Sequence, residues 1–161
     1  MSIRPLSSLP VRALLLGALG GARSMTPLAV LGAQHDRPEL AGSWRGWPVF
    51  RAPLGRRLLV LAAAGELVGD KLPQTPSRLG AFPLAGRVGT GVVVGLALAS
   101  SEGGDRRVLL AVLGGVGALL GSWAGASGRS ALGRATGLPD PVVALAEDAI
   151  AVGGSIALLR R

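Results

Sequence analysis

The sequence contains no cysteine, no tyrosine, a single histidine and only 3% aromatic residues. The absence of cysteine excludes disulfides, thiolate metal ligands and thiol catalysis within this sequence. The one histidine, His35, stands beside Asp36 and Arg37 in a polar connector, where no second histidine can share a metal ion with it. We therefore expect a solvated loop histidine, no metal site and no cofactor.

Charged residues are also scarce. They make up 16% of the 161 residues, whereas a soluble domain usually carries roughly 25%. Hydrophobic residues make up 49%, the mean hydropathy is +0.50, and 26 residues are glycine. A soluble domain would need more charge and more large aromatic side chains, whereas glycine suits helices that pack closely in lipid. The composition predicts an all-α, multi-pass membrane helix bundle with membrane lipids as its partners.

The net charge of +8 would suit a nucleic-acid-binding protein, but its distribution argues against one. Basic residues cluster where apolar runs end, at Arg4 and Arg12, Arg56 and Arg57, Arg106 and Arg107, and Arg160 and Arg161. Basic flanks of this kind set the orientation of membrane spans and contact anionic headgroups. The clusters lack the interleaved aromatic residues on which bases stack. We expect no nucleic-acid partner.

Apolar runs predict a single domain of about five transmembrane helices, at about residues 13–33, 54–72, 82–100, 108–128 and 142–159. The run 108–128 carries no charge and, at about 1.5 Å per residue, is long enough for a hydrocarbon core of about 30 Å. Residues 35–53 form a polar connector, whose Trp44 and Trp47 we expect at the level of the headgroups. A cleaved leader is an alternative interpretation of the first run, although the apolar pattern resumes after Arg23.

Prolines and glycines mark helix ends and helix contacts. Pro27 is expected to kink or break the first helix. Pro73 and Pro76 are expected to end the second helix, and Asp140 to cap the fifth. Two glycine ridges predict close helix contacts, within the chain or in a homo-oligomer. They are Gly91 with Gly95, and Gly117 with Gly121 and Gly125.

Six ionisable residues lie inside or at the ends of the apolar runs: Arg23, Glu66, Asp70, Arg87, Glu147 and Asp148. A charge in hydrocarbon costs about 2.5 kcal/mol or more, so such groups are expected to face a protein interior and to pair there. Glu66 and Asp70 share one helix face. Glu147 and Asp148 diverge by about 100° and are expected to meet different partners.

Further charges complete this predicted polar centre. Lys71 and Arg78 lie at the exit of the second helix. Arg23 lies within the first span, so its partner must come from another helix, and we expect Asp70 to be that partner. The resulting set suits either a structural network or a substrate or ion path.

The polar centre allows three interpretations. In the first, arginines neutralise carboxylates through their planar guanidinium groups, with Arg129 at a span end as one of them, and the network fixes helix register. In the second, the centre is a path or pocket for an ion, a proton or a lipid headgroup. An inverted repeat, in which Arg23-Ser24 mirrors Arg129-Ser130, would support it. In the third, paired carboxylates act on a lipid phosphate. We assign no catalytic residue, because the sequence lacks a recognisable nucleophile with a base and a phosphate-binding glycine motif.

Several segments together resemble a known family. They are residues 21–29, 65–73, 76–78, 86–87, 138–140 and 146–149, and the most specific is Asp-Lys-Leu-Pro-x-x-Pro-Ser-Arg at 70–78. The chain is similar, from about Leu14 to Leu158, to the bacterial membrane family catalogued as domain of unknown function 4126. The resemblance implies a small integral membrane protein and implies no activity.

Basic residues also predict an orientation in the cell membrane. Five spans would place the two termini on opposite sides. The side with the C-terminus would carry nine basic residues, Arg37, Arg45, Arg51, Arg56, Arg57, Arg106, Arg107, Arg160 and Arg161. The other side would carry six, Arg4, Arg12, Lys71, Arg78, Arg129 and Arg134. The positive-inside rule then predicts a cytoplasmic C-terminus.

Overall fold

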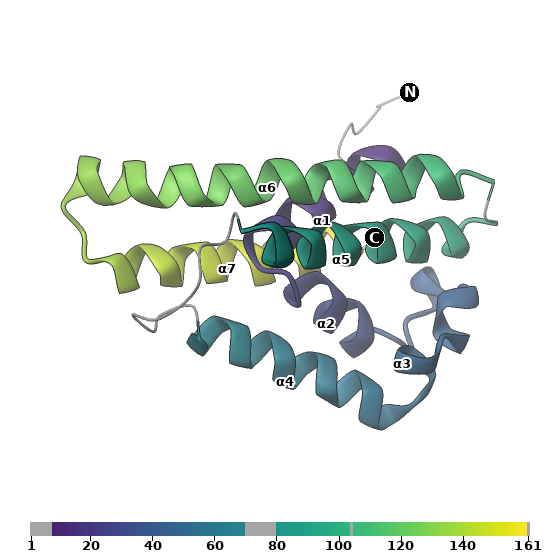
Figure 1. Cartoon of the computed structure of the whole chain (residues 1–161). Helices are drawn as coiled ribbons and strands as arrows, with labels where there is room; N and C mark the ends of the chain where they lie inside the picture. Colours follow the sequence, from purple (N-terminus) through teal and green to yellow (C-terminus); the bar gives the residue numbers. More distant parts are fainter. Residues whose placement is uncertain (1–7, 70–79, 104, 161) are drawn as a thin grey trace.

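The computed structural model describes residues 8–69, 80–103 and 105–160, and every regular element in these ranges is a helix (Figure 1). In chain order these elements are α1 (Leu9–Ala22), α2 (Thr26–Ala33), the 3₁₀ turns η2 (Pro38–Leu40) and η3 (Ser43–Gly46), α3 (Pro48–Arg51), α4 (Pro53–Gly69), α5 (Ala81–Ser101), α6 (Arg107–Thr136) and α7 (Asp140–Leu159). The all-α class expected from the sequence is confirmed.

Three of the described helices, α5, α6 and α7, are long and apolar enough to cross a membrane, and α1 is a shorter apolar helix. The three long helices correspond to the last three predicted spans. The second predicted span begins, as expected, with α4, and its predicted end at Pro73 lies outside the described residues.

The helix α6 extends further than the sequence indicated. It continues past Gly128 to Thr136 and ends at Gly137, whose φ of 65° lies in the left-handed region that favours glycine. Alanine, leucine and arginine are frequent after Gly128, and all three are good helix formers. Arg129, which was predicted to lie at the end of a span, therefore lies within a continuous helix.

The helices α1 and α6 run parallel and touch through their backbones. A Cβ atom on Gly117 would lie 2.1 Å from the carbonyl oxygen of Leu14, and one on Gly121 would lie 1.9 Å from that of Ala18. Only glycine allows so close an approach of two helices. This glycine ridge therefore packs against a helix of the same chain.

The helix α5 packs antiparallel to α6 in the same manner. A Cβ atom on Gly91 would lie 2.3 Å from the carbonyl oxygen of Gly114, and one on Gly95 would lie 2.0 Å from that of Leu110. The helix α6 thus packs closely against both α1 and α5, which meet it at the same residue, Gly114. Figure 1 shows α6 and α5 side by side, with α7 following α6 back along the bundle.

The connector folds into a compact cap on the end of α5. Trp44 is fully buried, donates a hydrogen bond from Nε1 to the carbonyl oxygen of Leu40 at 2.7 Å, and packs edge-on against Phe50 and His35. Its backbone N–H donates to Ser100 Oγ at 3.2 Å. Trp44 therefore packs inside the connector, and the expectation that His35 is a solvated loop residue is wrong, because its ring packs against Trp44 and its side chain is only 17% exposed.

The chain turns back on itself after α1, so the first predicted span is not one crossing. Leu9, at the start of α1, lines a hollow with Ala99 and Arg106, at the end of α5 and just before α6. After the break between α1 and α2 the chain returns to this same end, where Ser101 Oγ donates to the carbonyl oxygen of Leu40 at 3.2 Å. We call this end of the bundle, which also holds residues 35–53, the connector end. The two helices form a re-entrant hairpin.

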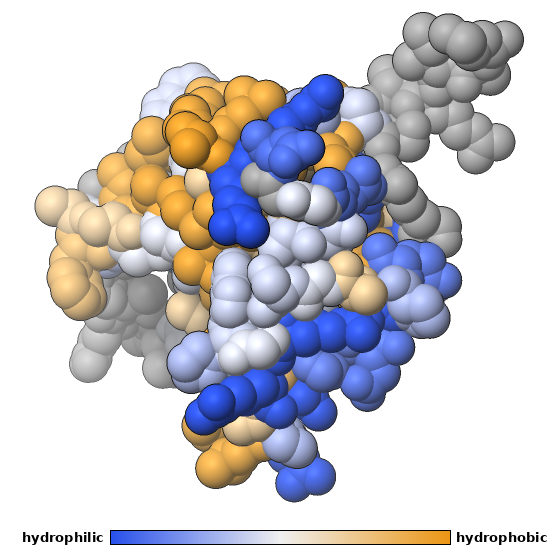
Figure 2. Space-filling model, turned by 90° about the vertical axis from the view of Figure 1, so that its right-hand side faces the viewer, coloured by the Kyte–Doolittle hydropathy of each residue, from blue (hydrophilic) through white to orange (hydrophobic). Residues whose placement is uncertain are grey.

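The end of α7 also lies at the connector end. Arg12 of α1 is buried and donates from Nε to the carbonyl oxygen of Leu158 at 2.8 Å, where a cation is favoured by the helix dipole. The expectation that five spans place the termini on opposite sides is therefore wrong for the described helices, because the hairpin adds no crossing. Figure 2 looks onto this end, where hydrophilic residues cover much of the surface beside hydrophobic ones.

Candidate functional site at the break between α1 and α2

The centre of the molecule is a helix break. The helix α1 ends at Ala22, α2 begins at Thr26, and Arg23 between them has extended backbone (φ −139°, ψ 95°). A helix end leaves carbonyl or N–H groups without intrahelical partners. In a membrane such groups need partners from the protein itself. The sequence predicted the break at Pro27, and the structure adds what satisfies it.

Arg87 of α5 and Ser122 of α6 cover the carbonyl end of α1. Arg87 Nη1 donates to the carbonyl oxygens of Gly21 at 2.5 Å and Ala22 at 3.1 Å. Ser122 Oγ, which lies 2.7 Å from the carbonyl oxygen of Ala118 in its own helix, shares its proton with the carbonyl oxygen of Gly21 at 3.1 Å. A guanidinium at a helix C-terminus also matches the helix dipole. Sequence reasoning placed Arg87 in the polar centre but missed both its backbone role and Ser122. The one signal for Ser122 was a hydroxyl following Gly121 in a glycine ridge.

Glu66 of α4 covers the N–H end of α2. Its carboxylate accepts hydrogen bonds from the backbone N–H groups of Ser24 at 2.8 Å and Met25 at 2.9 Å, and from Ser24 Oγ at 2.9 Å. A carboxylate at a helix N-terminus is favoured by both the free N–H groups and the dipole. Glu66 Oε1 also lies 3.6 Å from Arg87 Nη2. This pair connects the two halves of the hairpin.

Arg23 joins the hairpin to α7. Its side chain is fully buried, and its Nε donates to Asp148 Oδ1 at 2.6 Å, while its Nη2 lies 3.5 Å from Glu147 Oε2. Glu147 Oε2 also lies 3.9 Å from Arg129 Nη1. The two adjacent carboxylates thus face different surroundings, as their helical spacing implied. Asp70, the partner expected first, lies outside the described residues.

Lys71 and Arg78, the other two residues of the predicted polar centre, also lie outside the described residues. The inverted repeat receives no support from the helices that are described. Arg23 lies at a helix break, whereas its suggested counterpart Arg129 lies within the continuous helix α6.

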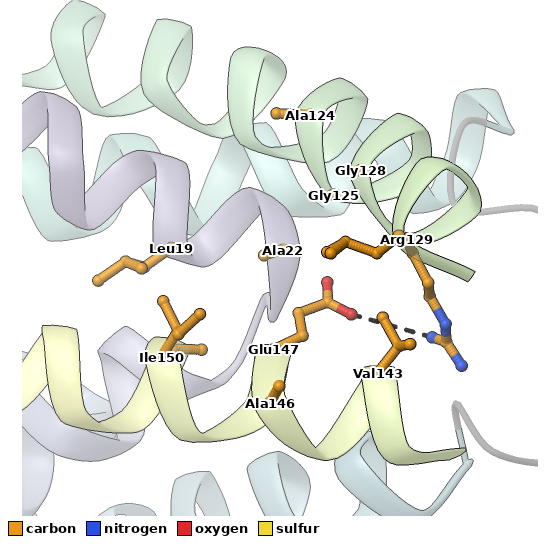
Figure 3. A pocket seen from close by; sticks show the side chains of 12 residues that line it. Leu19, Ala22, Ala124, Gly125, Gly128, Arg129, Val143, Ala146, Glu147 and Ile150 are labelled. Carbon is orange, nitrogen blue, oxygen red and sulfur yellow. Dashed lines mark ion pairs between the residues drawn. The ribbon is translucent and has the colours of Figure 1, made fainter. Parts of the chain in front are cut away.

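A cavity of about 190 Å³ lies between α1, α6 and α7 and reaches the charged centre. Its wall is mostly apolar, with Leu19, Val143 and Ile150 among the lining residues, and it carries two charged groups, Glu147 and Arg129. Figure 3 shows the Glu147 carboxylate projecting from α7 between α1 and α6, with its ion pair to Arg129 drawn dashed.

Glycine makes room for the carboxylate in this cavity. A Cβ atom on Gly125 would lie 3.2 Å from Glu147 Oε1. The third member of the α6 ridge therefore faces the Glu147 side chain, whereas Gly117 and Gly121 face backbone.

An exposed ion pair stands beside the cavity. Arg129 Nε donates to Asp140 Oδ1 at 2.7 Å, and the Asp140 side chain is 67% exposed. Asp140 was predicted to be the N-cap of the last helix. It is instead the first residue of α7, after Pro139, and its carboxylate binds Arg129 in place of a backbone N–H.

The chemistry of this centre is that of charge pairing. Within the described ranges, no cluster of three or more histidine, cysteine or acidic residues could hold a metal ion. The arrangement can neutralise buried charge, satisfy the broken helix, and offer the Glu147 carboxylate to a small molecule in the cavity.

Comparison with protein families matches residues 11–160 to the family described as Domain of unknown function (DUF4126). The match spans nearly the whole chain, and the protein belongs to this family. The resemblance noted from the sequence is thereby confirmed. No curated protein and no solved structure matches the chain.

Proposed function

We propose that this protein is a small multi-pass membrane transporter for organic cations with an apolar body, and that Glu147 is the carboxylate that binds them. One observation carries the proposal. Glu147 belongs both to the buried ion-pair network at the helix break and to the wall of the cavity. Ionisable groups inside membrane segments commonly mark substrate or ion paths.

The character of the cavity supports an amphiphilic ligand. An apolar cavity of about 150 Å³ accepts a molecule of the size of benzene, and this cavity of about 190 Å³ is somewhat larger. Its apolar wall suits a hydrocarbon body, and the Glu147 carboxylate suits a cationic group.

Charge around the cavity favours a cation over an anion. Among the described residues, the cluster holds two arginines, Arg23 and Arg129, and three carboxylates, Asp140, Glu147 and Asp148. Glu147 lies 3.5 Å and 3.9 Å from its two arginines, whereas Asp148 lies 2.6 Å from Arg23 and Asp140 lies 2.7 Å from Arg129. A bound cation can take Glu147 while Arg129 keeps Asp140 and Arg23 keeps Asp148.

The position of the cavity along the bundle supports a path. At about 1.5 Å per residue, Arg129 lies about 33 Å along α6 from Arg107 at the connector end. If a hydrocarbon core of about 30 Å begins near Arg107, the cavity at Arg129 opens near the opposite membrane surface. Broken helices that meet charged groups within the membrane recur at the binding sites of transporters.

The second candidate function is purely structural. It is favoured by Glu66 and Arg87, whose carboxylate and guanidinium already satisfy both ends of the helix break. In that case Glu147 is one more neutralising charge and the cavity binds no cation.

A matched pair of ligands separates these functions. Benzyltrimethylammonium is a permanent cation, and neopentylbenzene is its uncharged isostere. Calorimetric titration of the purified protein in detergent should give saturable binding of the cation and much weaker binding of the isostere. Glu147→Gln should weaken cation binding at least about thirtyfold, since losing one partner of a buried charge contact costs about 2 kcal/mol or more.

Glu102→Gln is the control, because Glu102 is an exposed carboxylate at the connector end. It should bind the cation like the wild type. Uptake of the radiolabelled cation into proteoliposomes should follow the same order. Equal binding of cation and isostere, or an unchanged Glu147→Gln variant, would overturn the proposal in favour of the structural role.

A further inference from the structure

A second hollow lies at the connector end, far from Glu147. Its volume is about 520 Å³, and it is bounded by Gly32 and Ala33 of α2, Asp36, and Pro53, Arg56, Arg57, Val60 and Leu61 of α4. Apolar side chains of α4 continue from it along the helix. Leu61 and Val68 are 65% and 66% exposed.

The two arginines of this hollow differ in their freedom. Arg56 donates from Nη1 to the carbonyl oxygen of Phe50 at 2.8 Å, which fixes its guanidinium at the end of α3. Arg57 is exposed, and no described residue binds its side chain. Arg57 is therefore the donor that is available to a ligand.

Asp36 is the one acid of the hollow. Its carboxylate lies 2.7 Å from His35 Nδ1, and this hydrogen bond lowers its pKa below the usual value. Asp36 is consequently ionised at neutral pH, and the hollow keeps one net positive charge from its two arginines.

We propose that this hollow between α2 and α4 is a binding site for one anionic phospholipid, whose phosphate contacts Arg57 and whose acyl chain follows the apolar side of α4. Charge complementarity identifies the headgroup, and the exposed Val60, Leu61 and Val68 identify the tail.

The depth of the site agrees with this occupant. The connector end is rich in arginine: Arg37, Arg45, Arg51, Arg56 and Arg57 lie in the connector and early α4, and Arg106 and Arg107 at the start of α6. Such a cluster marks the level of anionic headgroups. From Arg57 to Val68 the helix rises about 16 Å at about 1.5 Å per residue, close to half of a hydrocarbon core of about 30 Å.

Native mass spectrometry of the full chain in detergent tests this site. Phosphatidylglycerol and phosphatidylcholine are titrated separately, and their bound fractions give two affinities. The wild type should bind phosphatidylglycerol more tightly. Arg57→Gln should weaken phosphatidylglycerol binding about fivefold, which corresponds to about 1 kcal/mol for one arginine at a lipid headgroup.

Arg107→Gln is the matched control, since Arg107 is an exposed arginine of the same end outside the hollow. It should change the affinity less than about twofold. If Arg57→Gln and Arg107→Gln lose the same affinity for phosphatidylglycerol, the lipid is held by diffuse attraction to the basic surface and not by this site. If the wild type binds phosphatidylglycerol and phosphatidylcholine with equal affinity, the site does not select an anionic headgroup, and the proposal is wrong. Neither result bears on cation binding at Glu147.

Discussion

Arg87 and Glu66 hold the two ends of one broken helix and lie 3.6 Å from each other. The guanidinium covers the carbonyl end of α1, and the carboxylate covers the N–H end of α2. Each side chain therefore neutralises the charge of the other and also forms hydrogen bonds with backbone groups that the helix break leaves without partners. This explains why charges occur in runs that are otherwise apolar enough for a membrane.

Replacing Arg87 should expose the cost of this arrangement. Arg87→Met leaves the Glu66 carboxylate and the carbonyl groups of Gly21 and Ala22 without their cation. We expect a loss of about 3 kcal/mol in the free energy of unfolding, measured as a lowered thermal midpoint in detergent. Arg107→Met, which removes an exposed arginine, should change stability by less than about 0.5 kcal/mol. Similar losses in both variants would contradict the assignment.

Arg23 should couple more strongly to Asp148 than to Glu147. The shorter contact, 2.6 Å against 3.5 Å, and the deeper burial of Asp148 are the reasons. Two double-mutant cycles on thermal stability, Arg23→Ala with Asp148→Asn and Arg23→Ala with Glu147→Gln, measure the two couplings. We expect about 1 kcal/mol or more for the first cycle and less for the second. Strict additivity with Asp148→Asn would mean that this pair does not form.

The glycine ridge of α6 offers a test of helix packing. Gly121→Ala places a methyl group against the carbonyl oxygen of Ala18 and should cost about 1–3 kcal/mol. Gly133→Ala lies on the same helix, where nothing stands within 4 Å of the added atom, and should be neutral or stabilising. The difference between their thermal midpoints is the measurement. Two equal midpoints would show that α1 and α6 do not approach as described.

The ends of the chain should lie on one side of the membrane. Arg12 binds the carbonyl oxygen of Leu158, so the start of α1 and the end of α7 share the connector end. This moves Arg12 to the arginine-rich side and reinforces the prediction of a cytoplasmic C-terminus. A reporter that is active only in the cytoplasm should therefore be active when it is fused to either terminus. Reporters that reveal opposite sides would contradict the hairpin.

The sequence predicted the elements of this fold better than their direction. Pro27 marked the break, and Glu66, Arg87 and Glu147 marked the centre, because proline and charge act locally. The return of the chain was not predictable, since residues 28–33 are as apolar as a continuing span, and hydropathy carries no direction. The burial of Trp44 was not predicted for a similar reason: the connector packs on the end of α5, where the Trp44 backbone N–H donates to Ser100 Oγ, far along the chain.

The site was predictable as a set of residues and not as a set of pairs. An apolar run shows that Arg23 needs a partner, but several carboxylates qualify by chemistry alone. Only packing brings α7 to Arg23 and opens a cavity on Glu147. The backbone roles of Arg87 and Glu66 followed in principle from the expected break, because freed carbonyl and N–H groups need partners.

Access to Glu147 from water is the central claim, and the absence of cysteine from the sequence allows a direct test. Val143→Cys places a single thiol in the cavity wall, and Ala144→Cys places one at a neighbouring position that is fully buried outside it. In intact membranes, a charged, membrane-impermeant methanethiosulfonate should label Val143→Cys from the side opposite the connector end. Benzyltrimethylammonium should slow that reaction, and Ala144→Cys should remain unlabelled. A Val143→Cys variant that is as unreactive as Ala144→Cys, or whose labelling the cation leaves unchanged, would contradict the account.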